Sequence, residues 1–287
     1  MYGMMPSRCW NDFDEQLPHW SNLLQCSLFT SFPVRIEDKS AMPLKARIKY
    51  IFNVLRYGTG PEARQKKRLK KLREKEAKFK SERWEQTEDL ARRRYDSYDE
   101  YVSHQASKLD KVIDRLKRNE LAELNEFRER FQLCSALADA RSILCLGARL
   151  GTEVKALHSL GYFAVGIDLN PGPNNAYVLP GDFHKVVFPD SSVDAIYTNT
   201  MDHVFDLPRM IGEVTRLLRL NGLFLVEIEV GFAEGHLPGD FESIHWRDSD
   251  TFTNKICELG SFALESVTDL GKTRRGQRKL ILFRKPV

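Results

Sequence analysis

Residues 142–172 read SILCLGARLGTEVKALHSLGYFAVGIDLNPG, and the architecture of the protein follows from this segment. A short apolar run, ILCLG, precedes an amphipathic segment, TEVKALHSLG, and a second apolar run, FAVGID, comes next. Short apolar runs on both sides of a helical segment predict a strand, a crossover helix and a parallel strand. Helices bury both faces of such strands, which explains why the runs contain few polar residues.

The same alternation continues toward the C-terminus. The apolar run VDAIYTN at 193–199, a helical segment at 207–220 and the apolar run GLFLVEIEV at 222–230 repeat it. The sequence therefore predicts an α/β domain over residues 134–287, with a mostly parallel sheet covered by helices on both faces. Ligands of open parallel sheets bind beyond the carboxyl ends of the strands, so the residues directly after each apolar run are the candidates for a site.

The turn after the first run contains Gly147, Ala148, Arg149 and Gly151. Its small residues let the backbone approach a ligand closely, and Gly151 can adopt a positive φ. A dinucleotide-binding turn would carry a second glycine where Arg149 stands, because a side chain there obstructs the approach to a pyrophosphate. Beside a helix N-terminus, Arg149 could instead pair with a carboxylate of a ligand.

The second run ends in Asp168, roughly 20 positions after the glycine turn. A carboxylate at this place can accept hydrogen bonds from both hydroxyls of a ribose. A structural role as a turn former before Asn170, Pro171 and Gly172 is the alternative.

These motifs resemble those of the class I S-adenosylmethionine-dependent methyltransferases. The resemblance spans about residues 133–287. It includes GDF at 181–183, similar to the family's adenine-contacting segment, and FPDSSVDAIYTNTMDHV at 188–204, similar to its fourth-strand signature. The combination of GARLGTEV, GIDLNPG, GDFH and NTMDHV also resembles a subgroup of bacterial, phage and plant proteins whose acceptor is generally unassigned. The resemblance implies a Rossmann-like sheet of about seven strands, closed by antiparallel strands at 261–270 and 279–283.

The resemblance further implies an enzyme that transfers the methyl group of S-adenosyl-L-methionine. The residues expected to bind this cofactor are Gly147, Ala148, Arg149, Gly151, Asp168, Leu169, Gly181, Asp182, Phe183 and Asn199. Cys145 stands at the usual acidic position, which helps to hold the amino end of the cofactor, and Arg149 replaces the middle glycine. We therefore expect altered recognition of the methionine end, with a domain that no longer binds the cofactor as the alternative.

Methyl transfer needs an acceptor held in line with the methyl group and, where necessary, a base for the acceptor's proton. His203 beside Asp202 is the first candidate for this base and His184 the second, with a structural hydrogen bond as the alternative for each. Glu229 and His245 are candidates for contact with the acceptor. No helical HxxxH or comparable spacing appears among the nearby His, Asp and Glu residues, so we predict no metal.

Three segments precede the α/β domain, because 287 residues exceed the usual size of one domain. We expect an irregular lead at 1–43, a highly charged helical extension at 44–94, and helices over the cofactor site at 95–133. Tyr98, Tyr101 and His104 share one face of the last segment and suit a lid over a ligand. Tyrosines that only pack the helix onto the sheet are the alternative.

A dense basic run occupies residues 64–80. It could follow the phosphates of a nucleic acid, but interspersed glutamates favour a solvated helix with i to i+4 ion pairs. The formal net charge of +4 does not demand a nucleic-acid partner. The expected acceptor is a small molecule or saccharide. An RNA or protein acceptor docked through the basic helix and a non-catalytic cofactor-binding protein are the alternatives.

The remaining features concern the compartment. The 5 cysteines are scattered without a CxxC pair, which argues against a disulfide framework and a zinc site and favours a reducing environment. Residues 1–20 lack the pattern of a secretory signal, and no uncharged apolar run approaches the roughly 20 residues that a bilayer requires. The sequence thus predicts a soluble cytoplasmic protein without a membrane partner, and it leaves the oligomeric state open.

Overall fold

The computed structural model describes Ala46, residues 61–272 and residues 276–287. The predicted irregular lead at 1–43 and, apart from Ala46, the first part of the predicted extension lie outside these described residues. The chain divides into two units at residues 58 and 59, and every described residue except Ala46 belongs to the second unit.

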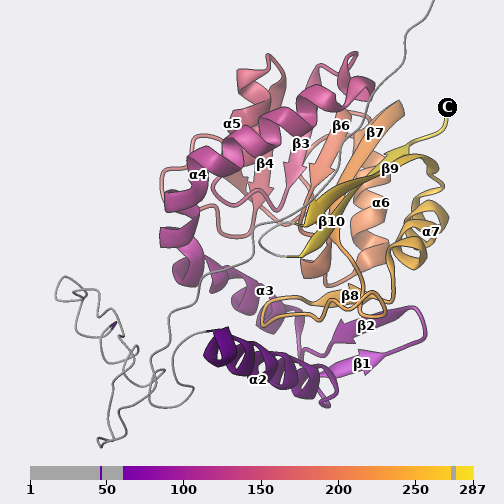
Figure 1. Ribbon diagram of the computed structural model, residues 1–287. Coiled ribbons are helices and arrows are strands. Elements are labelled where there is room, and N and C mark those ends of the chain that lie inside the picture. Colours follow the sequence, from indigo (N-terminus) through magenta and orange to yellow (C-terminus); the bar gives the residue numbers. More distant parts are fainter. Residues whose placement is uncertain (1–45, 47–60, 273–275) are drawn as a thin grey trace, which may run out of the picture. The chain divides into compact units, whose positions relative to one another are not determined.

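A seven-stranded sheet in the order β5-β4-β3-β6-β7-β10-β9 forms the centre of this unit (Figure 1). The parallel strands are β3 (Ser142–Leu146), β4 (Phe163–Asp168), β5 (Val178–Pro180), β6 (Val193–Thr198) and β7 (Leu218–Glu229). β10 (Gln277–Arg284) runs antiparallel to β7, and β9 (Ala263–Lys272) runs antiparallel to β10. The predicted α/β class and the mostly parallel, Rossmann-like sheet of about seven strands are confirmed.

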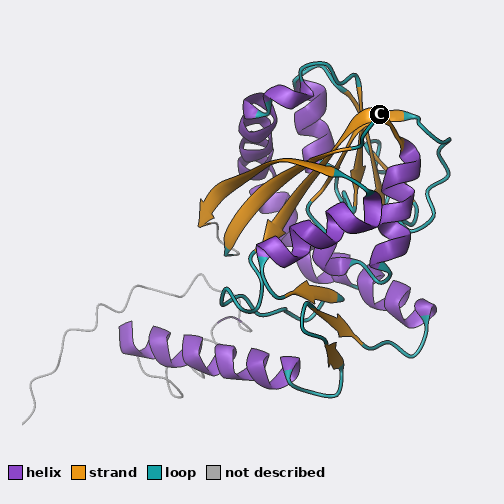
Figure 2. Ribbon diagram, turned by 90° about the vertical axis from the view of Figure 1, so that its right-hand side faces the viewer, coloured by secondary structure: helices purple, strands orange, loops and turns teal. Residues whose placement is uncertain are grey.

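Helices cover both faces of the sheet (Figures 1 and 2). α4 (Lys108–Leu133) and α5 (Thr152–Ser159) pack on one face, and α6 (Leu207–Leu217) and α7 (Ser249–Gly260) pack on the other. Successive side chains of β3 alternate between the two layers: Ile143 and Cys145 lie under α4 and α5, and Leu144 and Leu146 lie under α6 and α7. Burial on both faces is the reason that the parallel strands read as continuous apolar runs.

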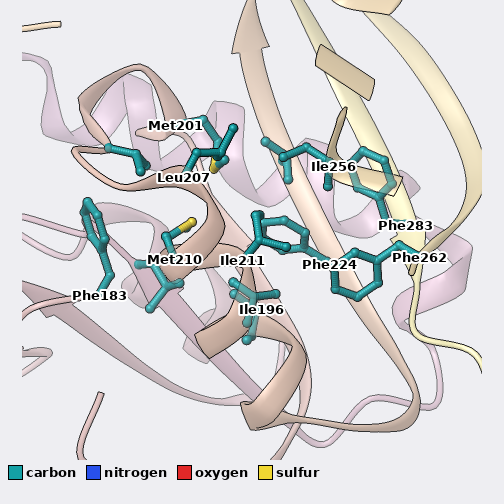
Figure 3. Packing of buried hydrophobic residues seen from close by; sticks show 14 of the residues in the cluster. Phe183, Ile196, Met201, Leu207, Met210, Ile211, Phe224, Ile256, Phe262 and Phe283 are labelled. Carbon is teal, nitrogen blue, oxygen red and sulfur yellow. The ribbon is translucent and has the colours of Figure 1, made fainter. Parts of the chain in front are cut away.

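The core under α6 and α7 is built around aromatic rings (Figure 3). Phe224 of β7 packs against Phe283 of β10 and Phe262, with ring centroids 6.0 Å and 5.8 Å apart. Each fully buried phenylalanine contributes roughly 1.5–3 kcal/mol relative to an exposed ring. These contacts hold the antiparallel strands against the parallel part of the sheet.

A second, three-stranded antiparallel sheet lies outside the Rossmann-like core. It consists of β1 (Trp84–Gln86), β2 (Leu90–Arg93) and β8 (Ile244–Trp246). The sequence predicted a helical extension over 44–94, but its helix, α2 (Pro61–Phe79), ends at Phe79 and two strands follow. Strand pairing prevails because Trp84 and Ala91 bury against Phe79, while β8 supplies a partner from a distant part of the chain.

The predicted helices at 95–133 are α3 (Tyr98–Ala106) and α4. Ser97 caps α3, since its side chain accepts a hydrogen bond from the backbone N–H of Glu100 at 3.1 Å. Phe127 and Phe131 of α4 pack edge-on against Tyr197 of β6, with ring centroids 6.0 Å and 5.0 Å away. Within the described part of the chain, no helix combines the length and the apolar character needed to cross a membrane.

A buried ion cluster joins α4 to the sheet. The carboxylate of Glu227, which is 1% exposed, accepts hydrogen bonds from Arg130 Nη1 at 2.8 and 2.9 Å. Arg278 donates to the same carboxylate at 3.2 Å, and the hydroxyl of Tyr197 donates at 2.9 Å. Two guanidinium groups from different elements therefore share one buried carboxylate; Arg130 also pairs with the exposed Glu126 at 3.0 Å, and Arg278 lies 3.8 Å from Glu229.

We expect Glu227→Ala to lower the free energy of unfolding by up to about 3–5 kcal/mol, because two arginines lose their shared buried counter-charge and keep only the contacts with Glu126 and Glu229. Chemical denaturation measures this change. Glu258→Ala is the matched control: Glu258 pairs with Lys255 on the surface at 2.8 Å. The control should lose less than about 1 kcal/mol. Equal losses in the two variants would contradict a structural role of the cluster.

Candidate functional site

The glycine turn between β3 and α5 lies against the loop that follows β6. Gly147 has a φ of +72°, and a Cβ atom at this position would lie 2.2 Å from the Oγ1 atom of Thr200. A side chain is therefore excluded both by backbone conformation and by space. Gly151 has a φ of +76° and precedes the first residue of α5.

Arg149 adopts the left-handed conformation, with a φ of 46°, although it is not a glycine. This conformation costs about 1–2 kcal/mol for an L-residue. Its backbone N–H donates to Oδ2 of Asp168 at 3.0 Å, and the N–H of Asn170 donates to Oδ1 at 2.8 Å. The turn thus fixes the orientation of the Asp168 carboxylate at the end of β4, so Asp168 is a turn former and also a residue at the predicted site.

Two cavities open at the carboxyl ends of the strands. The larger has a volume of about 350 Å³ and lies between the glycine turn, α4, residues 199–203 and the loop at 236–242. The smaller, of about 30 Å³, lies over Asp168 and beneath α3. Gly147, Arg149, Thr200 and His203 line both cavities, so the two are adjacent. Their position is the one expected for a ligand of an open parallel sheet.

The predicted cofactor residues divide between these cavities. Gly147, Ala148, Arg149 and Asn199 line the larger one. Asp168, Leu169 and Phe183 line the smaller one together with Gly147 and Arg149. Gly151, Gly181 and Asp182 line neither.

Asp182 is engaged within the protein. Its carboxylate accepts hydrogen bonds from the hydroxyl of Tyr98 and from Nδ1 of His184, the latter at 2.8 Å. Burial opposes ionisation, but these hydrogen bonds outweigh it and lower the pKa of Asp182 to about 2. Asp182 therefore ties α3 to the loop that follows β5.

Of the two histidines proposed as bases, only His203 lines the cavities. Its Nδ1 lies 2.9 Å from the carbonyl oxygen of Phe241, so Nδ1 carries the proton and Nε2 is the acceptor. Nε2 faces the ammonium group of Lys108, and Asp202 lies 3.7 Å away. Burial, with a contribution from Lys108, holds the pKa of His203 well below its usual range, so the ring is neutral at pH 7. Burial raises the pKa of Asp202.

His184 is 1% exposed and lies away from both cavities. Its Nδ1 donates to Asp182, and its Nε2 accepts the backbone N–H of Asp206 at 3.2 Å. Because both ring nitrogens are engaged, the ring holds the loop after β5 against the start of α6. This arrangement is the structural alternative that the sequence left open.

The residues proposed for acceptor contact are also separated. Glu229 lines the larger cavity, 2.5 Å from Nε2 of His236, and Tyr101 lines the smaller one. The hydroxyl of Tyr101 is buried without a hydrogen-bond partner in the described structure. Tyr98 binds Asp182, and His104 stacks on Phe241 with ring centroids 4.9 Å apart.

His245 lies in the small sheet and donates from Nε2 to the carbonyl oxygen of His236 at 3.0 Å, away from both cavities. In the described part of the chain, no group of three or more His, Cys, Asp or Glu residues is placed to hold a metal ion.

Several residues of the larger cavity were not foreseen. They are Lys75, Lys108, Glu123, Glu153, His236, Glu242 and Arg278. Most come from segments far from the motifs, where nothing in the sequence marks them as neighbours of the glycine turn. Glu153 is different, because it lies inside the GTEV motif and follows the turn directly.

Comparisons with known proteins agree with this geometry. Residues 144–226 match the family described as a methyltransferase domain. The structure of 1,6-didemethyltoxoflavin-N1-methyltransferase from Burkholderia thailandensis, solved with 1,6-didemethyltoxoflavin and S-adenosylhomocysteine, is similar with a TM-score of 0.53 and 14% identity. The match covers 70% of this chain and 97% of that one.

Two further solved structures are similar to this chain. A putative methyltransferase from Haloferax volcanii, solved with a methyltransferase activator, has a TM-score of 0.48 and 17% identity over 64% of this chain and 98% of that one. An S-adenosylmethionine-dependent methyltransferase from Methanosarcina mazei has a TM-score of 0.43 and 20% identity over 52% and 93%. No curated protein matches the chain.

The chain therefore shares its fold with a solved methyltransferase, and its central part, residues 144–226, matches a methyltransferase domain. These findings support S-adenosyl-L-methionine as the cofactor, as the sequence predicted. The narrower subgroup defined by GARLGTEV, GDFH and NTMDHV stays a prediction.

Gly147→Ala should destabilise the chain and weaken binding of S-adenosylhomocysteine at least about tenfold, because the new methyl group would overlap Thr200 and move the turn. Thermal denaturation and calorimetric titration measure the two effects. Gly161→Ala is the control, since Gly161 has a φ of +89° with no atom within 4 Å of the added methyl group. The control should lose about 1 kcal/mol of stability and keep its affinity. Matching affinities in the two variants would show that the turn does not shape the site.

Proposed function

We propose that this chain is an S-adenosyl-L-methionine-dependent methyltransferase whose acceptor is a polar small molecule or a saccharide. The observation that carries the proposal is the cavity of about 350 Å³ in which the glycine turn and the ring of His203 share one wall. Its volume lies in the range of small-molecule sites, roughly 300–1,000 Å³. The methyltransferase match over residues 144–226 supports the same reaction class.

The residues present fit the cofactor. The Asp168 carboxylate, held at the end of β4, would accept the ribose hydroxyls, with Leu169 and Phe183 flanking the base. Arg149 and Asn199 line the cavity on the side of the glycine turn and would hold the methionine moiety. When bound, S-adenosyl-L-methionine supplies a methyl group activated by its sulfonium charge.

α3 acts as a lid over the smaller cavity. Tyr101 and Gln105 of α3 line a space of only about 30 Å³, which is far smaller than an adenosine group. We therefore expect α3 to shift when the cofactor binds. Its contacts with Asp182 through Tyr98 and with Ser243 through Gln105 are then the ones that must adjust.

His203 acts as the base for the acceptor. The hydrogen bond from Nδ1 to Phe241 fixes the tautomer and leaves Nε2 as the acceptor. Nε2 contacts the ammonium group of Lys108, and it can accept a proton from a hydroxyl group of the acceptor when that contact gives way. Asp202 lies beside the ring and would stabilise the imidazolium that forms. His184 is not part of this arrangement, since it lines neither cavity.

The charges around the larger cavity favour a polar acceptor. Lys108 and Arg278 contribute positive charge, and Glu229 and Glu242 contribute negative charge. Such a mixed lining suits a ligand with several hydroxyl groups better than one with a single net charge. A saccharide or a hydroxylated small molecule meets this requirement. The compartment that we propose is the reducing cytosol, supported by the free thiols of Cys134, Cys145 and Cys257.

The proposal is tested by titrating the full chain with S-adenosyl-L-methionine and S-adenosylhomocysteine, with mass spectrometry of any nucleoside that copurifies. A methyl-transfer assay with radiolabelled cofactor against saccharide, small-molecule, RNA and protein acceptors follows. Binding together with transfer to a saccharide or small molecule is the expected result. Binding without transfer to any acceptor would favour a non-catalytic cofactor-binding protein, and absence of binding would overturn the proposal.

Replacement of the base should slow the reaction. His203→Ala is expected to lower kcat about 10²–10⁴-fold, with little change in the affinity for S-adenosylhomocysteine, because the proton acceptor is lost while the cofactor contacts remain. His158→Ala is the control, since His158 lies on the exposed side of α5. An unchanged kcat in His203→Ala removes the catalytic role.

The pH dependence of methyl transfer should also follow from the burial of His203. A base works in its neutral form, which predominates above its pKa, and the pKa of His203 lies well below 6.5. With saturating cofactor, kcat should therefore stay level as the pH falls from 8 to about 6, where an ordinary histidine would already lose activity. A decline with a midpoint near 6.5 that disappears in His203→Ala would show that the ring is not enclosed as described.

RNA or protein docked through α2 is the second candidate acceptor. The observation that favours it is that α2 carries a dense set of basic residues and that one of them, Lys75, reaches the larger cavity. Binding of a nucleic acid would weaken steeply with salt, because each phosphate contact releases counterions. A small acceptor that contacts no phosphate would bind with little dependence on salt.

A further inference from the structure

Glu153 is a buried carboxyl group at the larger cavity. Glu153 is the second residue of α5 and is 6% exposed. It lines the cavity beside Gly147 and Ala148. Among the described residues, no other side chain donates a hydrogen bond to it or forms an ion pair with it. Burial, together with the charges of Asp168 and Glu227, raises the pKa of Glu153 to about 8, against the opposing effects of a hydrogen bond from its own backbone N–H and of the charge of Arg149.

An isolated carboxyl group in such a place costs stability, because burial removes water from it and no cation compensates. Three of the other carboxylates that line the cavity lie next to a basic side chain or a histidine. Glu229 lies close to His236 and Arg278, Asp240 pairs with Lys78, and Asp202 lies next to His203. Glu153 thus combines deep burial with a lining position and, among the described residues, the lack of a side-chain hydrogen bond or ion pair. A strongly perturbed carboxyl group in a cleft is a candidate for ligand binding.

Glu153 also lies close to the position where the family's usual acid is missing. Cys145 occupies that position on β3, and it is fully buried. Burial raises the pKa of the Cys145 thiol, and the nearby charge of Glu153 raises it further. The sharp turn at 147–151 folds the start of α5 back beside the end of β3, so a carboxylate on α5 can serve the space that a carboxylate on β3 would serve.

We propose that Glu153 binds the α-ammonium group of the cofactor's methionine moiety and replaces the acid absent at position 145. This inference rests on the proposed function. An ammonium group supplies the positive charge and the hydrogen-bond donors that the buried carboxylate lacks. Arg149, on the same turn, offers a guanidinium group to the carboxylate of the same moiety, so each end of the amino acid meets the opposite charge.

The first test compares two ligands. The full chain is titrated calorimetrically with S-adenosylhomocysteine and with its deaminated analogue, which lacks only the amino group. Glu153→Gln should weaken S-adenosylhomocysteine about tenfold to hundredfold, the usual effect of losing a charge-assisted hydrogen bond, and should leave the deaminated analogue unchanged. Glu258→Gln is the matched control, because Glu258 lies on the surface of α7, where it pairs with Lys255 at 2.8 Å, and lines neither cavity. This variant should keep the wild-type affinities for both ligands.

A second measurement uses the protonation state of Glu153. With a pKa of about 8 the carboxyl group is mostly protonated at pH 7 in the free protein, whereas ion pairing with the ammonium group requires the carboxylate. Binding at pH 7 should therefore release close to one proton. Titrations in buffers of different ionisation enthalpy should detect this proton in the wild type and in Glu258→Gln, and its absence in Glu153→Gln.

The outcomes separate this inference from the proposed function. A wild-type chain that binds neither S-adenosylhomocysteine nor S-adenosyl-L-methionine overturns both. A wild-type chain that binds S-adenosylhomocysteine and its deaminated analogue equally well, without releasing a proton, overturns only the role of Glu153. This comparison needs no variant, so it decides the matter even if Glu153→Gln does not fold.

Discussion

The turn at residues 147–151 is the constraint on which the site depends. Gly147, Arg149 and Gly151 all have positive φ values, which carry the chain from the end of β3 into α5 within five residues. The turn places Gly147 against Thr200, and its backbone orients Asp168. A looser connection would separate these three features, and the ligand space at the ends of β3, β4 and β6 would lose its shape.

Buried charged side chains lie close to the larger cavity, and they are of two kinds. Glu227, Arg130, Arg278 and Tyr197 form a network in which each charge has a partner, and this network holds α4 on the sheet. Glu153 lies nearby without such a partner. The contrast separates two uses of buried charge: paired groups fix the position of elements, whereas an unpaired group at a cavity is suited to a ligand.

The second sheet supports the loop at 236–242, which lines the larger cavity. β1 and β2 come from the charged N-terminal region, and β8 follows the long connection after β7. Lys78 of α2 pairs with Asp240, and Arg93 of β2 donates to the carbonyl oxygens of Gly239 and Glu242. These contacts hold the loop at 236–242, which contributes Phe241, the partner of His203. The N-terminal region therefore supports the proposed base from a distance.

The sequence by itself determined the α/β class, the parallel strands, the glycine turn and Asp168, because hydrophobic period and turn chemistry are local properties of the chain. It could not foresee β1 and β2, since their partner β8 lies about 150 residues away and strand pairing outweighs the local preference for helix. Only the tertiary structure distinguished His203, which lines the cavities, from His184, which is buried away from them and accepts a hydrogen bond from Asp206. The sequence shows each histidine but not the groups that surround it. The same holds for Glu153: its place in the chain was visible from the start, but its burial and its lack of a partner arise from packing among distant segments.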